Sequence, residues 1–224
     1  MSFDLRDLQD IPDPLAGRAP PALPGPKLPD APAPTRQAMR RRRILASVVS
    51  VVWVSAIVAF FGGVRGDLSP SPLILAHVFL PALFGGAALF TAMSGGPAGV
   101  GPAIRPTLIL SLLAPITFVL TALCFPTEDA RDHFLKAVFI CGDIVLVMGA
   151  VPLAALAWSL RHACVSAAPW RSVLLAVAVG LTSAAAIGAH CSVTDGLHVA
   201  LGHGLPILIL GLVGWFLVRR VTKV

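Results

Sequence analysis

The sequence predicts an all-α integral membrane protein, a bundle of six transmembrane helices preceded by a disordered, proline-rich N-terminal tail. Hydrophobic residues make up 56% of the chain and charged residues 12%, which is too little charge to cover the surface of a water-soluble domain. The apolar residues fall in runs of about 20, the length that a helix needs to cross the hydrocarbon layer. Basic residues gather at the ends of those runs, as they do in membrane proteins.

Residues 1–43 form the tail. Nine prolines lie between Pro12 and Pro34 with few large apolar residues, so this stretch cannot bury enough surface to fold and is predicted to be a semi-extended linker. Before it, Leu5, Leu8 and Ile11 recur at every third position, which indicates a short amphipathic segment that is unstable alone. Either this segment is part of the disordered tail, or it becomes helical on a partner and binds through these three residues.

The transmembrane domain is predicted to extend over residues 44–221. Its connections are short and rich in Gly, Pro and Ser, which favours antiparallel neighbouring helices. We expect the six helices near residues 44–64, 73–93, 106–125, 134–160, 171–190 and 198–218.

The basic residues predict the orientation of the bundle. With six helices, one side of the membrane receives Arg36, Arg40, Arg41, Arg42, Arg43, Arg105, Arg161, Arg171, Arg219, Arg220 and Lys223. The other side receives only Arg65, Arg131 and Lys136. The positive-inside rule therefore predicts a multi-pass protein of the bacterial inner membrane with both termini in the cytoplasm.

The predicted topology places most of the cysteines and histidines in the outer half of the bilayer. This group comprises His77, Cys124, Cys141, Asp143, His190, Cys191, His198 and His203. An ionisable group at membrane depth is costly and is a functional candidate by default. The simpler interpretation is that the cysteines are small core residues and the histidines are polar groups at the membrane interface.

One functional interpretation is a thiol switch. Cys141 and Cys191 are the most plausible disulfide pair, and Cys124 is a third redox candidate. If both helices stand upright, the depths of Cys141 and Cys191 differ by roughly 10 Å, whereas a disulfide needs Cα atoms within about 7 Å. A static pair is therefore marginal.

A second interpretation is a zinc or copper site with His77, Cys141, His198 and His203 as ligands, a donor set that suits either metal. His198 and His203 are five positions apart, so on an α-helix they do not share a face, which argues against a two-histidine site within one helix. A third interpretation, transport, is the least favoured because the sequence has no paired broken helices and few buried charges.

Two other function classes are not supported. The sequence contains no combination of nucleophile, base and orienting group and no phosphate-binding loop, so we do not expect an enzyme. The net charge of +6 comes from residues at helix ends and the chain has no tyrosine, so we expect no direct nucleic-acid binding.

Several features of the C-terminal half recur together in one known family. They are a cysteine in the fourth helix, an arginine-containing inner loop, a small-residue fifth helix that ends in His-Cys, and a final helix with a basic end. In this chain the resemblance rests on Cys141 and Pro152 of the fourth helix, the loop 160–171, the small-residue run 180–188 and the Ala-His-Cys sequence at 189–191. Residues 135–220 thus resemble the NrsF-like group of six-helix bacterial anti-sigma factors. Ser192 stands where family members usually carry proline. The layout is also similar to that of the myxobacterial light-response regulators of carotenoid biosynthesis.

The resemblance implies a negative regulator of transcription. Such a protein would sequester an extracytoplasmic-function sigma factor at the inner membrane and release it on stress, with light and oxidants as candidate signals. Its partners would be that sigma factor and the lipid bilayer. The alternative is a metal- or redox-responsive membrane protein that does not act on transcription.

Overall fold

The computed structural model describes residues 35–64, 74–94, 104–124, 134–160, 168–191 and 196–218. Every regular element within these ranges is a helix, and no strand occurs among them, which confirms the all-α prediction. The tail residues Leu5, Leu8 and Ile11 lie outside the described residues.

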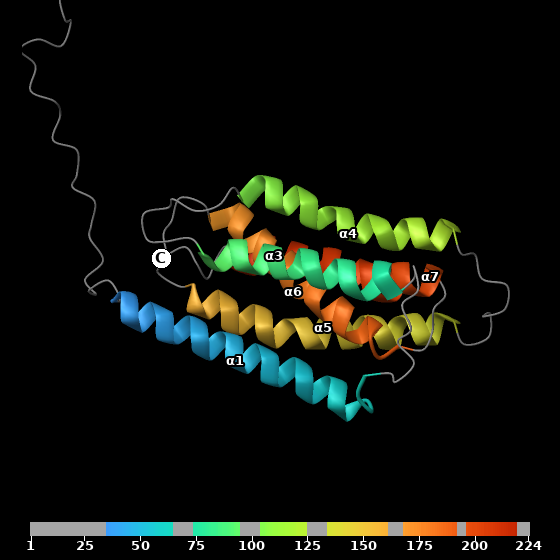
Figure 1. The fold of residues 1–224 in the computed structure, drawn as a ribbon, viewed down its shortest axis with the longest axis horizontal. Helices are drawn as coiled ribbons and strands as arrows, with labels where there is room; N and C mark the ends of the chain where they lie inside the picture. The colour runs from blue at the N-terminus through green and yellow to red at the C-terminus, as the bar shows by residue number, and fades with distance from the viewer. Residues whose placement is uncertain are drawn as a thin grey trace, which may run out of the picture. The chain divides into compact units, whose positions relative to one another are not determined.

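The helices follow one another as shown in Figure 1. They are α1 (Arg36–Phe60), η2 (Leu75–Phe79), α3 (Leu80–Ser94), α4 (Ile104–Cys124), α5 (Phe134–Ser159), α6 (Ala168–Gly188), α7 (Gly196–His198), η3 (Val199–Gly204), α8 (Leu205–Val213) and η4 (Gly214–Val218). The elements labelled η are π-helical. Since η2 leads directly into α3, and α7 to η4 are continuous, each of these groups is one helix with wider turns inside it.

Among the described residues, five helices are long and apolar enough to cross a membrane, which indicates a membrane protein. They are Gln37–Phe60, Leu75–Met93, Phe134–Ser159, Trp170–Gly188 and Gly196–Phe216. The sixth predicted span, 106–125, coincides with α4, a helix of 21 residues, of which Ser111–Leu120 is identified as a shorter apolar stretch. The count of six spans therefore stays a prediction.

The first helix begins at Arg36, inside the region that the sequence assigned to the tail. Thr35 caps it, because the Thr35 side chain accepts a hydrogen bond from the backbone N–H of Ala38 at 3.2 Å. The helix ends where Gly62 and Gly63 adopt positive φ angles of 98° and 84°, a conformation that glycine takes without steric cost.

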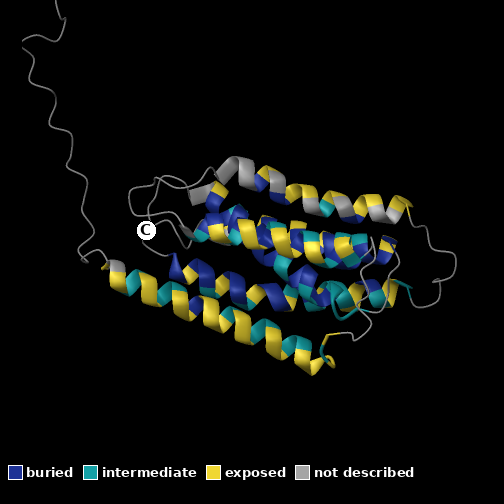
Figure 2. Cartoon of the chain, in the orientation of Figure 1, coloured by how far each residue is buried: buried dark blue, intermediate teal, exposed yellow. Residues whose placement is uncertain are grey.

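Helix α6 lies at the centre of the bundle and contacts α3, α4, α5 and α8. Its side chains are mostly buried (Figure 2), and Leu174, Leu175 and Leu181 have no exposed surface. Small residues bring its backbone close to α8, because a Cβ atom at Gly180 would lie only 3.0 Å from the Cα atom of Ile207. Such close approach is typical of helix packing in membranes.

Helix α1 lies at the edge of the bundle, mainly against α5, and much of its surface is exposed (Figure 2). The exposed side chains are large and apolar, including Val51, Val52 and Phe60, which is 84% exposed. In water this surface would be an aggregation hazard. In a bilayer it faces lipid chains of the same polarity, which fits a membrane-spanning helix.

The C-terminal end of α3 receives two arginine side chains from other helices. Arg43 of α1 donates from Nη1 to the carbonyl oxygen of Met93 at 2.8 Å, and Arg171 of α6 donates from Nε to that of Ala92 at 2.6 Å. The last carbonyls of a helix lack intrahelical donors and carry partial negative charge, so both contacts stabilise this end. They also join α1, α3 and α6 at the same end of the bundle.

Candidate functional site

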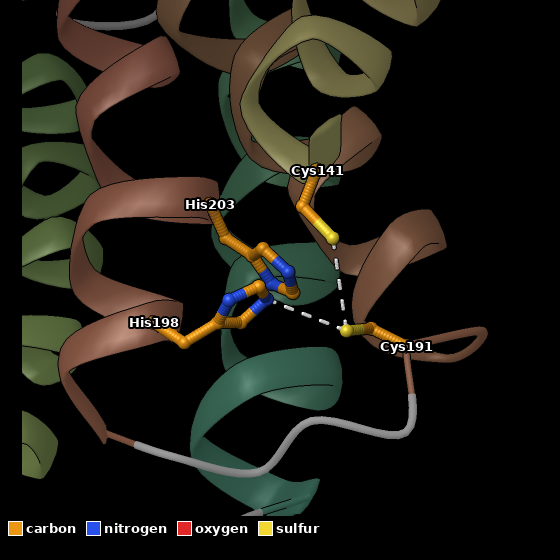
Figure 3. Close-up of side chains that lie close together, drawn as sticks. All are labelled: Cys141, Cys191, His198 and His203. Atoms are coloured by element: carbon orange, nitrogen blue, oxygen red, sulfur yellow. Dashed lines mark hydrogen bonds between the residues drawn. The ribbon is translucent and has the colours of Figure 1, made fainter. Parts of the chain in front are cut away.

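Four cysteine and histidine side chains converge at one point of the bundle (Figure 3). They are Cys141 of α5, Cys191 just after α6, His198 of α7 and His203 of η3, and one donor atom from each lies within 4.8 Å of the others. The two Sγ atoms are 3.8 Å apart, and Cys191 Sγ is 3.5 Å from His198 Nε2. We call these four residues the Cys–His cluster.

A π-helical turn brings the two histidines together. The imidazole rings of His198 and His203 meet edge to face with centroids 5.4 Å apart. The expectation that they cannot share a helix face was wrong because it assumed an α-helix. Residues 199–204 are π-helical, and Leu205 N–H donates to the carbonyl of Ala200, five residues back. With hydrogen bonds from i to i−5, residues five positions apart stack on one face.

Cys191 lies beside Cys141 in the structure. After α6 ends at Gly188, the backbone N–H of Cys191 donates to the carbonyl of Ile187 at 2.7 Å. This bond joins residues four positions apart, as in an α-helix, so Cys191 stays close to the end of α6. The expected depth difference of roughly 10 Å assumed that both helices stand upright. The observed sulfur separation of 3.8 Å shows that the two side chains meet.

Glycine 202 allows η3 to reach α5. A Cβ atom at this position would lie 3.3 Å from the carbonyl oxygen of Val138 and 3.5 Å from the Cβ atom of Cys141. Only a residue without a side chain permits this approach without displacement. Sequence reasoning did not identify Gly202, although its position one residue before His203 is the signal that was available.

The histidines of the Cys–His cluster carry unpaired nitrogens. His198 is 0% exposed and His203 is 1% exposed. His198 Nδ1 and both ring nitrogens of His203 have no hydrogen-bond partner among the described residues. Buried polar atoms of native proteins are normally paired, and an unpaired one costs about 1–3 kcal/mol. The four side chains could therefore hold a ligand that gives these nitrogens a partner.

The surroundings of Cys191 favour its ionised form. Hydrogen bonding to Cys141 lowers the pKa of the Cys191 thiol from its ordinary value, His198 and His203 act in the same direction, and burial acts against them. The thiolate is the form that binds metals and reacts with oxidants. The cluster thus suits both metal binding and thiol oxidation.

The other predicted site residues lie outside the Cys–His cluster. His77 is buried in η2 with its ring 5.8 Å from that of Phe118, and its Nε2 atom has no hydrogen-bond partner among the described residues. Cys124 is exposed at the end of α4, and Asp143 is exposed on α5. The structure therefore groups three of the predicted metal ligands with Cys191, which the sequence assigned to a redox role.

His190 links the cluster region to α1. Its Nδ1 atom donates to the carbonyl oxygen of Gly63 at 2.7 Å. Sequence reasoning treated His190 as a candidate polar group at the interface and missed this contact. The signals were the Gly62-Gly63 pair after the first helix and the position of His190 next to Cys191.

A family comparison covers most of the chain. The family model described as "NrsF: Negative regulator of sigma F" matches residues 29–223. The chain belongs to the NrsF family. The match includes residues 135–220, on which the resemblance was based, and also covers α1, the η2–α3 helix and α4. No curated protein and no solved structure matches the chain. Membership in the NrsF family identifies a sigma factor as the regulated partner and negative regulation as the role.

Proposed function

We propose that this NrsF-family protein is a membrane-bound anti-sigma factor. It sequesters an extracytoplasmic-function sigma factor at the bacterial inner membrane and releases it under envelope stress. The observation that carries the proposal is the family match over residues 29–223 of a chain with five long apolar helices. A sigma factor held at the membrane is kept from RNA polymerase, so its target genes stay silent.

The charge distribution supports a cytoplasmic location for both termini. Arg40, Arg41, Arg42 and Arg43 precede the apolar part of α1, and Arg171 stands near the start of α6 at the same end of the bundle, where Arg43 and Arg171 bind adjacent residues of α3. Basic residues are enriched on the cytoplasmic side of membrane proteins. Residues 1–43 then face the compartment that contains the sigma factor.

The tail supplies the proposed contact with the sigma factor. Leu5, Leu8 and Ile11 are its apolar anchors, and the proline-rich stretch after them is the tether. Folding of a short segment on its partner costs free energy and lowers affinity. Attachment to the membrane and further contacts from inner loops offset this cost by raising the effective concentration.

Release requires a path from the Cys–His cluster to the tail, and α1 provides one. His190, next to Cys191, holds the carbonyl of Gly63 at one end of α1. Trp53 in its middle donates from Nε1 to the carbonyl of Val147 on α5, the helix that carries Cys141. A chemical change at the cluster therefore acts on a helix that leads directly into the tail.

Co-purification tests this function. The full-length protein should retain the sigma factor that it regulates, and a variant with Leu5, Leu8 and Ile11 replaced by alanine should lose it. The matched control replaces Leu15, Leu23 and Leu28, the other leucines of the tail. Retention of the sigma factor by both triple variants and by a chain lacking residues 1–30 would refute the tail contact.

A transcription reporter separates the regulatory role from its alternative. Deleting the gene should raise expression from promoters of the sigma factor. Unchanged expression would contradict an anti-sigma role and would favour a metal- or redox-responsive membrane protein without a role in transcription.

A further inference from the structure

The Cys–His cluster contains two thiols and two imidazoles from three separate segments of the chain, and no acidic side chain is among its four donors. Two sulfur and two nitrogen donors form the ligand set of many tetrahedral zinc sites. We propose that Cys141, Cys191, His198 and His203 bind one Zn²⁺ ion in tetrahedral coordination.

The distances between donors match the edges of such a site. With Zn–S bonds of about 2.3 Å and Zn–N bonds of about 2.0–2.1 Å, a tetrahedron has edges of about 3.8 Å between two sulfurs and about 3.6 Å between sulfur and nitrogen. The structure has 3.8 Å between Cys141 Sγ and Cys191 Sγ, and 3.5 Å between Cys191 Sγ and His198 Nε2. These two distances match a tetrahedral site, and all four donor atoms lie within 4.8 Å of one another, so a small inward movement of the side chains would complete the coordination.

A metal ion would also give a partner to one of the unpaired nitrogens of His203. His203 is buried with both ring nitrogens unpaired among the described residues, and coordination gives one of them a partner. A disulfide between Cys141 and Cys191 would require the sulfurs to approach from 3.8 Å to about 2.05 Å, and it would leave His203 as it is. The disulfide explains the two cysteines, whereas the metal site explains all four residues.

Charge selects Zn²⁺ over Cu⁺ at this position. Each thiol loses its proton to water as it coordinates, so Zn²⁺ with two thiolates and two neutral imidazoles has no net charge. Cu⁺ in the same ligand set leaves one negative charge. The two histidines are buried and the two cysteines are half-buried, and an uncompensated charge is costly in such surroundings.

The bound ion would join α5, the end of α6 and the α7–η3 segment. This goes beyond the anti-sigma role, because the ion binds whether or not a sigma factor is present. The ion also fixes the position of Cys191. The neighbouring residue, His190, is hydrogen-bonded to the carbonyl of Gly63 just after α1. Loss of one thiolate ligand would break the cross-link.

The test is metal binding by the full-length protein, purified in detergent micelles without a histidine tag. After dialysis against a weak chelator, we expect one Zn²⁺ per chain by elemental analysis. Replacing Zn²⁺ with Co²⁺ should give the intense visible bands of tetrahedral cobalt and a thiolate-to-cobalt charge-transfer band. If the wild-type protein holds much less than one Zn²⁺ per chain, the proposal is overturned. A Co²⁺ spectrum that lacks the charge-transfer band would overturn it too. Neither result depends on the correct folding of a variant.

Variants identify the ligands. Cys141→Ser, Cys191→Ser, His198→Gln and His203→Gln should each weaken Zn²⁺ binding by more than about tenfold, since even outer-sphere changes cost 10–100-fold. Cys124→Ser and His77→Gln should retain binding, because neither residue belongs to the cluster. Equal losses in Cys124→Ser, or loss in His77→Gln, would overturn the four-ligand assignment. Detection of a Cys141–Cys191 disulfide as the main form by mass spectrometry would overturn it as well. These experiments measure metal binding and not sigma-factor binding, so their failure leaves the anti-sigma proposal intact.

Discussion

The imidazoles of His198 and His203, five positions apart in the sequence, lie edge to face with their centroids 5.4 Å apart. Their contact depends on a wide turn between them and on the seating of that turn against α5. Gly202 is the point of closest approach, and its substitution tests how much the cluster depends on the fit.

Replacing Gly202 with valine should separate η3 from α5. The new side chain meets the carbonyl of Val138 and the Cβ atom of Cys141 at contact distances that leave no room for further methyl groups. We expect a loss of about 1–3 kcal/mol of stability from overpacking. Thermal unfolding in detergent measures it. The matched control is Gly86→Ala, where a Cβ atom meets nothing within 4 Å; equal effects of the two substitutions would contradict the close fit.

Removing the His190 side chain should weaken the attachment of α1. His190→Ala loses the hydrogen bond to Gly63, worth about 1 kcal/mol, while the helices remain in place. If α1 carries the signal, transcription from the target promoters should rise without stress. His190→Asn retains a side-chain N–H donor and should preserve part of the repression. Unaltered reporter expression in the alanine variant, at equal protein levels, would mean that this contact does not transmit the signal.

Replacing Arg171 should destabilise the bundle more than replacing an exposed arginine. Arg171 is 9% exposed and donates from Nε to the carbonyl of Ala92. Arg171→Ala leaves that carbonyl without this charged donor, at a cost of about 1.5–3 kcal/mol. Arg40→Ala removes an exposed charge from α1 and is the control. Melting temperatures in detergent compare them, and a smaller shift for Arg171→Ala than for Arg40→Ala would refute the role of Arg171 as a helix cap.

A fusion at the C-terminus tests the number of spans. Six crossings place both termini on the same side, whereas five place them on opposite sides. If α4 crosses the membrane, alkaline phosphatase fused after Val224 should be inactive and a cytoplasmic reporter at that position should be active. A second fusion between α4 and α5 should show the reverse pattern. An active phosphatase at the C-terminus would contradict the six-helix topology.

Hydropathy was sufficient to predict the apolar helices, because bilayer thickness fixes their length and the side chains need only be apolar. The wide turns were not predictable in the same way, since a π turn leaves the apolar pattern of a uniformly hydrophobic helix unchanged. A signal did exist. Both η2 and η3 are followed by Leu-Pro, at Leu80-Pro81 and Leu205-Pro206. Proline lacks the N–H that would continue the α-helical ladder, which makes a wider preceding turn less costly.

The sequence predicted which residues form the candidate site, but it did not predict how their side chains are arranged. Positions near helix ends brought Cys141, Cys191, His198 and His203 into the same half of the bilayer, and the structure brings them into contact. What decides the pairing is how α5, the end of α6 and the α7–η3 segment pack, which the sequence does not show; in the structure the Sγ atoms of Cys141 and Cys191 lie 3.8 Å apart. His77 shares the residue type and the predicted depth, but its ring packs on Phe118.

Because most side chains of α1 are exposed at the edge of the bundle, bilayer thickness acts on it directly. Its candidate span Gln37–Phe60 has 24 residues, but Arg40 to Arg43 stand near its start, so the apolar part from Ile44 to Phe60 has 17. At 1.5 Å per residue this part covers about 26 Å, which is less than a hydrocarbon layer of about 30 Å. A helix that is too short thins the bilayer around it or extends its flanking charged side chains to the interface, at a cost of fractions of a kcal/mol per Å of mismatch. The energetic cost of inserting α1 therefore depends on the lipid composition of the membrane.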